Sequence, residues 1–208
     1  MAGAGAPSGA GPRGFQIISL PLFPLNAVLF PGGRLPLRIF EQRYMEMAKA
    51  CLRDSTPFGV CLIRDGAEVG APATPVEIGC IARIVEWDMA QLGVLQIGAQ
   101  GERRFRILER TVQADGLARA SVQLIEEESD AEIPAHCADC VRLLERIISS
   151  PGAPVLQPPY RMDSSAWVSS RLAEILPLPL DVKQALLELD DGRARLERVN
   201  SLWGAISA

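Results

Sequence analysis

Hydrophobic and polar residues alternate along the first 125 residues as they do in half-buried β-strands. Residues 94–100 show the pattern plainly, with Leu95, Ile97 and Ala99 on one side and polar or small residues on the other. The other predicted strands span 20–25, 34–40, 58–63, 78–88, 104–111 and 117–125. Glycine-containing turns separate several of them, including one predicted at Gly101-Glu102. Many short strands at this spacing predict a closed or nearly closed β-barrel.

The most apolar part of this half, residues 20–40, contains four prolines, at positions 21, 24, 31 and 36. Proline has no backbone N–H, so sheets accept it at strand starts, at bulges and on edge strands. Pro31-Gly32-Gly33 predicts a turn, and Pro36 shares the outward face of strand 34–40 with Arg34 and Arg38. The pattern therefore predicts an edge strand whose proline guards it against unwanted pairing.

A helical period replaces the alternation in two places. Phe40, Tyr44, Met47 and Cys51 form one helical stripe, which Thr56-Pro57 ends. Beyond the acidic run 126–130 the helical period continues to the end of the chain. Asp163 or Ser164 is a suitable N-cap for one helix, and Asp181 with Gln184 resembles a capping box for the next. Apolar residues at helical spacing within 196–206 predict a last amphipathic helix. A small helical bundle is therefore predicted after the barrel.

Strands followed by helices place the chain in the α+β class. The expected division is a flexible Gly/Ala/Pro-rich tail at 1–14, a barrel at 15–128 and a bundle at 129–208. Charge supports two parts, because residues 1–125 carry 13 basic and 11 acidic residues, whereas the remainder carries 8 and 14. Neither part has the strong basic excess of a nucleic-acid platform, so nucleic acid is not the expected partner.

Cysteine usage points to a reducing compartment. The five cysteines are an odd number in a long, core-rich chain, which favours free thiols. With no secretory signal and no apolar run of about 18 residues, a cytoplasmic protein without a membrane span is expected. Cys137 and Cys140 form a C-x-x-C beside His136, but they share a helical stripe and lack the second pair that a zinc site needs. Core cysteines are favoured over a redox pair or a metal site.

No catalytic constellation is predicted. Serines 164, 165, 169 and 170 lack a Gly-x-Ser-x-Gly elbow and a nearby base, so they are interpreted as helix-cap and helix-surface residues. Neither lysine, Lys49 or Lys183, lies in a phosphate-binding loop. We expect no catalytic residue, metal or cofactor. A thiol-dependent enzyme that uses Cys137 and Cys140 is the weakest alternative, because no base is visible.

Basic residues cluster on two neighbouring predicted strands, at Arg103, Arg104, Arg106, Arg110 and Arg119. Arg104 and Arg106 are expected to point outward, with Phe105 on the opposite side. The functional interpretation is a patch for an anion, RNA or an acidic peptide. The structural alternative is a solvated sheet face, which is favoured because no aromatic residues lie among the outward arginines.

The order of motifs resembles one known family, the N-terminal domain of Lon protease. The resemblance rests on LPLFPLNAVLFPGGRLPLRIFEQRY at the start, EIGCIARIVEW and GERRFRILE in the strands, and ILPLPLDVKQALLELDDGRARLERV at the end. It covers Leu20 to Trp203. It implies a PUA-like pseudo-barrel followed by a helical bundle, and a role in recognising substrate proteins. Without a Walker lysine or a Ser-Lys dyad partner, the chain is expected to be a free-standing domain of this type.

The resemblance implies a non-enzymatic module that binds peptide segments or partly unfolded proteins, in connection with proteolysis or protein quality control. An extended peptide would add to a strand edge or lie in an apolar groove. The expected contacts are Phe23, Phe30, Arg38, Tyr44 and Trp87. The alternative is an RNA- or anion-binding PUA-like protein that uses Arg103, Arg104 and Arg106, and the oligomeric state is left open, with a homodimer as one option.

Overall fold

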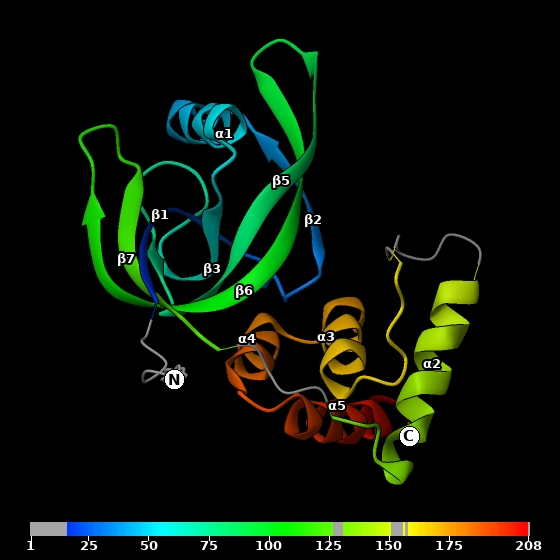
Figure 1. The fold of residues 1–208 in the computed structure, drawn as a ribbon. Coiled ribbons are helices and arrows are strands. Elements are labelled where there is room, and N and C mark those ends of the chain that lie inside the picture. The colour runs from blue at the N-terminus through cyan, green and yellow to red at the C-terminus, as the bar shows by residue number, and fades with distance from the viewer. Residues whose placement is uncertain (1–15, 127–130, 151–155, 157, 208) are drawn as a thin grey trace, which may run out of the picture.

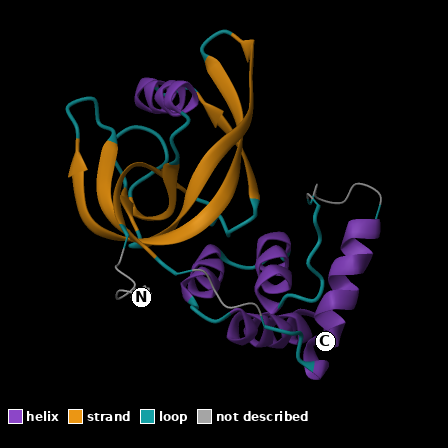
Figure 2. Ribbon diagram, viewed as in Figure 1, coloured by secondary structure: helices purple, strands orange, loops and turns teal. Residues whose placement is uncertain are grey.

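The structure is a computed structural model that describes residues 16–126, 131–150, 156 and 158–207. Strands and helix α1 come first and the other helices follow, so the predicted α+β class, a barrel followed by a bundle, is confirmed (Figures 1 and 2). The elements in chain order are β1 (Ile17–Leu25), β2 (Arg34–Ile39), α1 (Gln42–Asp54), β3 (Phe58–Asp65), β4 (Thr74–Pro75), β5 (Ile78–Gln91), β6 (Val94–Val112), β7 (Ala118–Leu124), η1 (Ala135–Cys137), α2 (Ala138–Ser149), α3 (Ser165–Ile175), α4 (Leu180–Glu188) and α5 (Gly192–Ser207). The predicted tail at 1–14 and the centre of the acidic run at 127–130 lie outside the described residues.

A ring of strands in the order β1–β7–β6–β5–β3 closes the barrel, because β1 also pairs with β3. β1 makes both contacts by changing partner along its length. Residues 17–21 pair antiparallel with β7, and residues 22–25 pair parallel with β3. Pro21 is the last residue of the first ladder, where β1 leaves β7. Closure leaves few free strand edges.

β6 is a single strand of 19 residues, so the predicted turn at Gly101-Glu102 is wrong. Gly101 stays in the ladder opposite Ala82. It also accepts a backbone hydrogen bond from Gly32 (2.8 Å) and donates one to Gly33 (2.9 Å). A β-carbon at position 101 would collide with the carbonyl oxygen of Phe30. The glycine therefore marks a close approach of two backbones and not a turn.

β2 lies outside the ring and pairs with the first half of β6, residues 34–39 against residues 95–100. Within the described part of the chain, its other edge has no strand partner. Pro36 is exposed on this strand. The predicted edge strand with an outward proline is therefore confirmed, and β2 offers a free edge beside the barrel (Figure 1).

The helices from α2 onward lie on one side of the barrel, opposite the projecting β5–β6 hairpin (Figure 1). Their apolar core takes in Phe30 and Ile78 from the barrel, so the two parts are packed together. As predicted, Ser164 caps α3, accepting the N–H of Trp167 at 3.1 Å. Among the described helices, none is long and apolar enough to cross a bilayer.

The predicted capping box at the start of α4 does not form. This helix begins after Pro179 with no side-chain cap. Gln184 instead donates through Nε2 to the Ile78 carbonyl oxygen at 3.0 Å. The side of α4 that carries Gln184 faces the barrel, and a buried amide there must find a partner in the barrel backbone.

Candidate functional site

A groove of about 330 Å³ follows β2 along its length. Every residue from 35 to 41 lines it, and Glu68 with Val69 from the loop after β3 forms the opposite wall. Phe40 and Val69, on the rim, are 58% and 56% exposed. The groove thus presents apolar side chains to solvent beside the unpaired edge of β2. Sequence periodicity identified the strand, but no sequence signal identified Val69.

Two of the predicted contacts form the floor of this groove. Phe23 from β1 stacks on Tyr44 from α1, with ring centroids 4.1 Å apart and planes inclined by 21°. The Arg43 guanidinium lies 4.7 Å from the centre of the Tyr44 ring and pairs with Glu41 at 2.9 Å. Burial raises the pKa of Tyr44, so its hydroxyl stays neutral at physiological pH. Both rings are only 5% exposed, so they form a packed, uncharged aromatic floor beneath the open rim. A third predicted contact, Arg38, is exposed on the wall.

The remaining two predicted contacts lie elsewhere. Phe30 is completely buried in the core that joins the barrel to the helices, so the prediction that it contacts a peptide is contradicted by its burial. Trp87 is 60% exposed on the β5–β6 hairpin, together with Met89 and Leu92. The hairpin projects away from the helices (Figure 1). Trp87 therefore belongs to a second exposed apolar surface and does not line the groove.

The three clustered arginines do not form one outward patch. Arg104 is only 3% exposed, and its Nη1 donates to the carbonyl oxygens of Leu187 (2.9 Å) and Leu189 (2.7 Å). The prediction that Arg104 points to solvent is wrong, because α4 covers this face of β6. Arg106 stays exposed and lies 4.0 Å from Glu77. Arg103 lines a cavity between barrel and helices.

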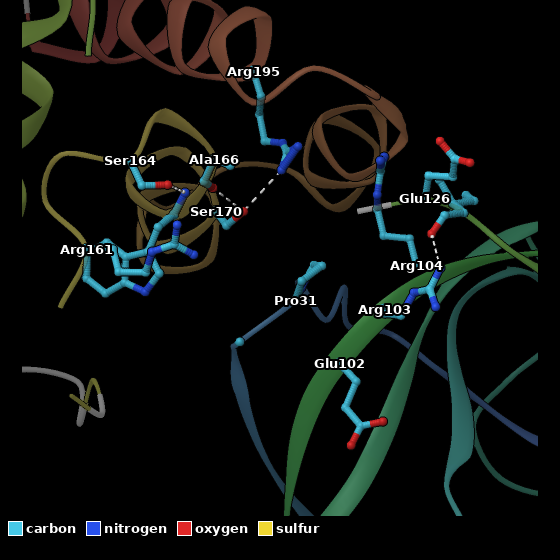
Figure 3. Close-up of a pocket in the computed structure, with 13 residues that line it drawn as sticks. Pro31, Glu102, Arg103, Arg104, Glu126, Arg161, Ser164, Ala166, Ser170 and Arg195 are labelled. Carbon is cyan, nitrogen blue, oxygen red and sulfur yellow. Dashed lines mark hydrogen bonds between the residues drawn. The ribbon is translucent and has the colours of Figure 1, made fainter. Parts of the chain in front are cut away.

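That cavity, of about 240 Å³, is shown in Figure 3. Arg195 reaches it from α5 and donates to Ser170 Oγ of α3 at 3.1 Å. Arg104 rises toward it from β6, and Arg161 approaches from the loop before α3 (Figure 3). The cavity lies between segments that are far apart in the sequence, so no local pattern predicts it.

A buried ion pair that sequence reasoning missed joins α3 to the turn before β2. Arg171 and Glu174 form a bidentate pair, with Nε–Oε2 and Nη2–Oε1 distances of 3.1 Å. Arg171 Nη2 also donates to the Pro31 carbonyl oxygen at 2.8 Å. A β-carbon on Gly33 would collide with the Glu174 carboxylate. The i,i+3 spacing could have suggested the pair, but not that it is buried against the Pro31-Gly32-Gly33 turn.

The buried pair of Arg171 and Glu174 predicts that the stability of the protein depends on pH. Burial raises the pKa of Glu174 to about 7, although Arg171 and the Phe30 backbone N–H lower it. The folded protein therefore holds a proton that the unfolded chain releases near pH 4.5. The stabilisation is complete below pH 4.5 and is lost as the pH rises through 7. Between pH 5 and pH 8, we expect the free energy of unfolding to fall by about 2–3 kcal/mol through this group.

Urea unfolding at pH 5 and pH 8 measures this loss. Glu174→Gln should remove most of the difference between the two pH values, because glutamine does not titrate. Glu46→Gln, on the exposed face of α1, is the matched control and should leave the difference unchanged. An equal pH dependence in wild type and Glu174→Gln would contradict the prediction.

The cysteines occupy core positions, as the helical stripe predicts. All five are buried and free. Burial, with a smaller contribution from neighbouring Cys137, raises the pKa of Cys140 to about 11, and burial also raises the pKa of Cys137. Since the thiolate is the reactive form, both side chains are poor nucleophiles in this setting.

Known proteins resemble this chain over nearly its whole length. Residues 19–203 match the family model for the ATP-dependent protease La (LON) substrate-binding domain. Lon protease from Anaeromyxobacter dehalogenans is 29% identical over 197 residues, and the match covers 88% of this chain but 22% of that protein. The chain thus spans about a fifth of the curated relatives that it matches first.

Solved structures show the same fold. A Lon N-terminal domain protein from Xanthomonas campestris has a TM-score of 0.74 at 38% identity, covering 88% of this chain and 98% of its own. The N-terminal domain of Lon protease from Mycobacterium avium complex has a TM-score of 0.62 at 18% identity, covering 88% of this chain and 96% of its own.

Proposed function

The chain belongs to the Lon substrate-binding domain family, and from that premise we propose that it binds extended apolar segments of partly unfolded proteins in the groove beside β2. The observation that carries the proposal is the combination of an exposed apolar groove with a free strand edge. The proposed role is one of binding, in connection with proteolysis of the kind named in its relatives. No chemical step is assigned to it.

The geometry suits an extended peptide. A peptide strand added to the free edge of β2 would exchange backbone hydrogen bonds with it. Alternate side chains of that peptide would point into the groove, above the buried Phe23–Tyr44 stack that forms its floor. Phe40 and Val69 would close over the peptide from the two walls. The exposed Arg38 would attract acidic side chains or the C-terminal carboxylate of a peptide. It would therefore favour peptides that carry such groups over those that do not.

Fluorescence anisotropy with a labelled ten-residue peptide of alternating leucine and serine tests the proposal. Phe40→Asp and Val69→Asp should each weaken binding at least tenfold, because burying an apolar side chain of this size contributes about 1.5–3 kcal/mol. Both positions are more than half exposed, so the fold should persist. Leu92→Asp, at the 97% exposed hairpin tip, is the matched control and should bind as wild type does.

A second peptide, N-methylated at alternate residues, separates strand addition from simple apolar contact. Methylation removes backbone donors, so binding should be lost if the peptide pairs with β2. Absence of binding by the wild-type protein at high micromolar concentration would overturn the proposed function. Loss of binding in Leu92→Asp, but not in the groove variants, would move the site to the hairpin of Trp87.

A further inference from the structure

The pairing of β2 with β6 shows which backbone groups of β2 face its free edge. Gly101 of β6 donates to the Gly33 carbonyl oxygen at 2.9 Å, so the backbone N–H of Gly101 points toward the β2 side of its strand. Residues 34–39 continue from this contact in an antiparallel register without a shift. Because backbone groups alternate between the two sides of a strand, the odd-numbered residues of β2 pair with β6. The even-numbered residues therefore face the free edge.

Pro36 is the even-numbered residue at the centre of this edge. Its ring nitrogen carries no hydrogen, so the edge offers three carbonyl oxygens, at Arg34, Pro36 and Arg38, but N–H groups only at Arg34 and Arg38. An added strand can donate to Pro36, but the carbonyl oxygen of its residue opposite Pro36 finds no donor. A chain end suits this position better than a continuing chain, because a terminal carboxylate can turn toward side chains.

The start of β2 is the basic end of the edge. Arg34 and Arg38 flank Pro36 and are exposed on the same side of the strand, and neither forms an ion pair with a described carboxylate. Glu86 from β5 extends over Gly98, the residue of β6 opposite Pro36. An added strand would lie on the other side of β2, two strand spacings or roughly 10 Å from Gly98. At that distance salt screens most of the repulsion from Glu86.

The opposite end of the groove is acidic. Glu41 and Glu68 both line it. Burial raises the pKa of Tyr44, and these two carboxylates raise it further although Arg43 lowers it, so both lie near the Tyr44 hydroxyl. Arg43 pairs with Glu41 at 2.9 Å, whereas Glu68 accepts the backbone N–H of Asn26. This polarity favours a peptide that runs antiparallel to β2, with its C-terminus at the start of the strand.

Helix α3 lies at the same end as the start of β2 (Figure 1). Arg171 of this helix donates to the Pro31 carbonyl oxygen at 2.8 Å and so holds the turn before β2. A peptide that continued past Arg34 would approach the helix. A peptide that ends opposite Pro36 avoids it.

We propose that the β2 groove binds the free C-terminus of an extended peptide, with the last residue opposite Pro36 and its carboxylate held by Arg34 and Arg38. The inference rests on the proposed function, because it assigns the direction and the end of the peptide in that groove. The N–H of the last residue donates to Pro36, and the third residue from the end exchanges two hydrogen bonds with Arg38. The penultimate side chain lies on the same side as Leu37 and points into the groove.

Fluorescence anisotropy with two ten-residue peptides of equal composition, labelled at the N-terminus, tests this arrangement. One peptide repeats Leu-Ser and ends in serine, so every leucine points into the groove when the carboxylate lies beside Arg34. The other repeats Ser-Leu and ends in leucine, so the same placement turns every leucine away. The acid of the first peptide should bind about fivefold more tightly than its C-terminal amide, which is the scale of an exposed ion pair. This difference should shrink as salt is added. For the second peptide, acid and amide should bind alike.

Variants assign the effect to single groups. Arg34→Ala should reduce the preference for the acid to less than about twofold and leave the amide unchanged. Arg106→Ala, which removes an exposed arginine of β6, is the matched control and should keep the preference. Pro36→Ala adds an N–H to the free edge and should tighten the amide by about threefold. Thermal melting shows whether each variant is folded.

N-methylation of the Leu-Ser peptide checks the pairing without changing the protein. Methylation of the last residue removes the N–H that faces Pro36 and should abolish the preference for the acid. Methylation of the penultimate residue removes an N–H that faces away from β2 and should have no effect on it.

The outcomes separate this inference from the proposed function. Absence of binding by all four unmethylated peptides would overturn both. Equal binding of the Leu-Ser acid and amide would overturn only the C-terminal site. A preference for the acid that survives Arg34→Ala, or that is equal in the two peptides, would also overturn it. Weaker binding of the acid than of the amide would indicate the reverse strand direction and overturn it as well.

Discussion

Replacing Phe105 with alanine is expected to destabilise the protein by about 3–5 kcal/mol. Phe105 lies in β6 at the centre of one barrel core and has no exposed surface. Its ring fills space that two glycines leave open: a β-carbon at Gly59 or Gly79 would approach ring atom Cζ to 2.8 Å or 2.7 Å. A closed ring of strands cannot move inward to fill the resulting void, so most of the cavity would remain.

Urea unfolding monitored by circular dichroism measures this loss. Leu108→Ala is the matched control, because Leu108 lies on the same strand but is 45% exposed. It should cost less than about 1 kcal/mol. A loss below about 1 kcal/mol for Phe105→Ala would show that the barrel relaxes around the missing ring.

Replacing Arg195 with methionine is expected to cost a similar amount, about 3–5 kcal/mol, because each buried hydrogen bond from a charged donor contributes about 1.5–3 kcal/mol. Arg195 is 1% exposed. Its guanidinium donates to the carbonyl oxygens of Leu186 (3.0 Å) and Leu189 (3.3 Å) and to Ser170 Oγ (3.1 Å). Carbonyl oxygens at the end of a helix have no partner within it. Methionine keeps the apolar stem but removes the hydrogen bonds to the Leu186 carbonyl oxygen and to Ser170 Oγ, whereas the Leu189 carbonyl oxygen keeps Arg104 Nη1 as a donor. The loss of these buried hydrogen bonds accounts for the expected destabilisation.

The control for this variant is an exposed arginine two residues earlier in the chain. Arg193 is on the same helix with a 57% exposed side chain, and it pairs with Glu197. Arg193→Met should change the free energy of unfolding by less than about 0.5 kcal/mol. Equal stability of Arg195→Met and Arg193→Met in urea unfolding would contradict the role assigned to Arg195.

Local chemistry in the sequence predicted most elements correctly. Alternation located β2 and β7, and the helical stripe of Tyr44 and Cys51 located α1, because one side of each element faces a core and the other does not. The prolines of residues 20–40 correctly indicated an edge strand at β2, since a missing backbone N–H is tolerated there. Three of the five predicted contacts, Phe23, Arg38 and Tyr44, meet in one groove.

Errors arose where a second layer covers a face that the pattern assigns to water. Arg104 alternates as an exposed residue would, but α4 lies over it and supplies the acceptors that make its burial tolerable. Gly101 resembles a turn glycine, yet it is needed because the Phe30 carbonyl oxygen comes close to it. In both cases the decisive neighbour lies far away in the sequence.

The sequence by itself determined the class of the fold, its edge strand and its family, because these depend on periodicity and on motif order within short windows. Only the tertiary structure decided which polar side chains are buried and which surfaces are hollow. The burial of the Arg171–Glu174 pair against the Pro31 turn, the arginine cavity and the wall formed by Val69 all require elements that only packing brings together. A charged side chain can be buried only where other groups satisfy it. For Arg104 these groups are the carbonyl oxygens of Leu187 and Leu189, which lie far from it in the sequence.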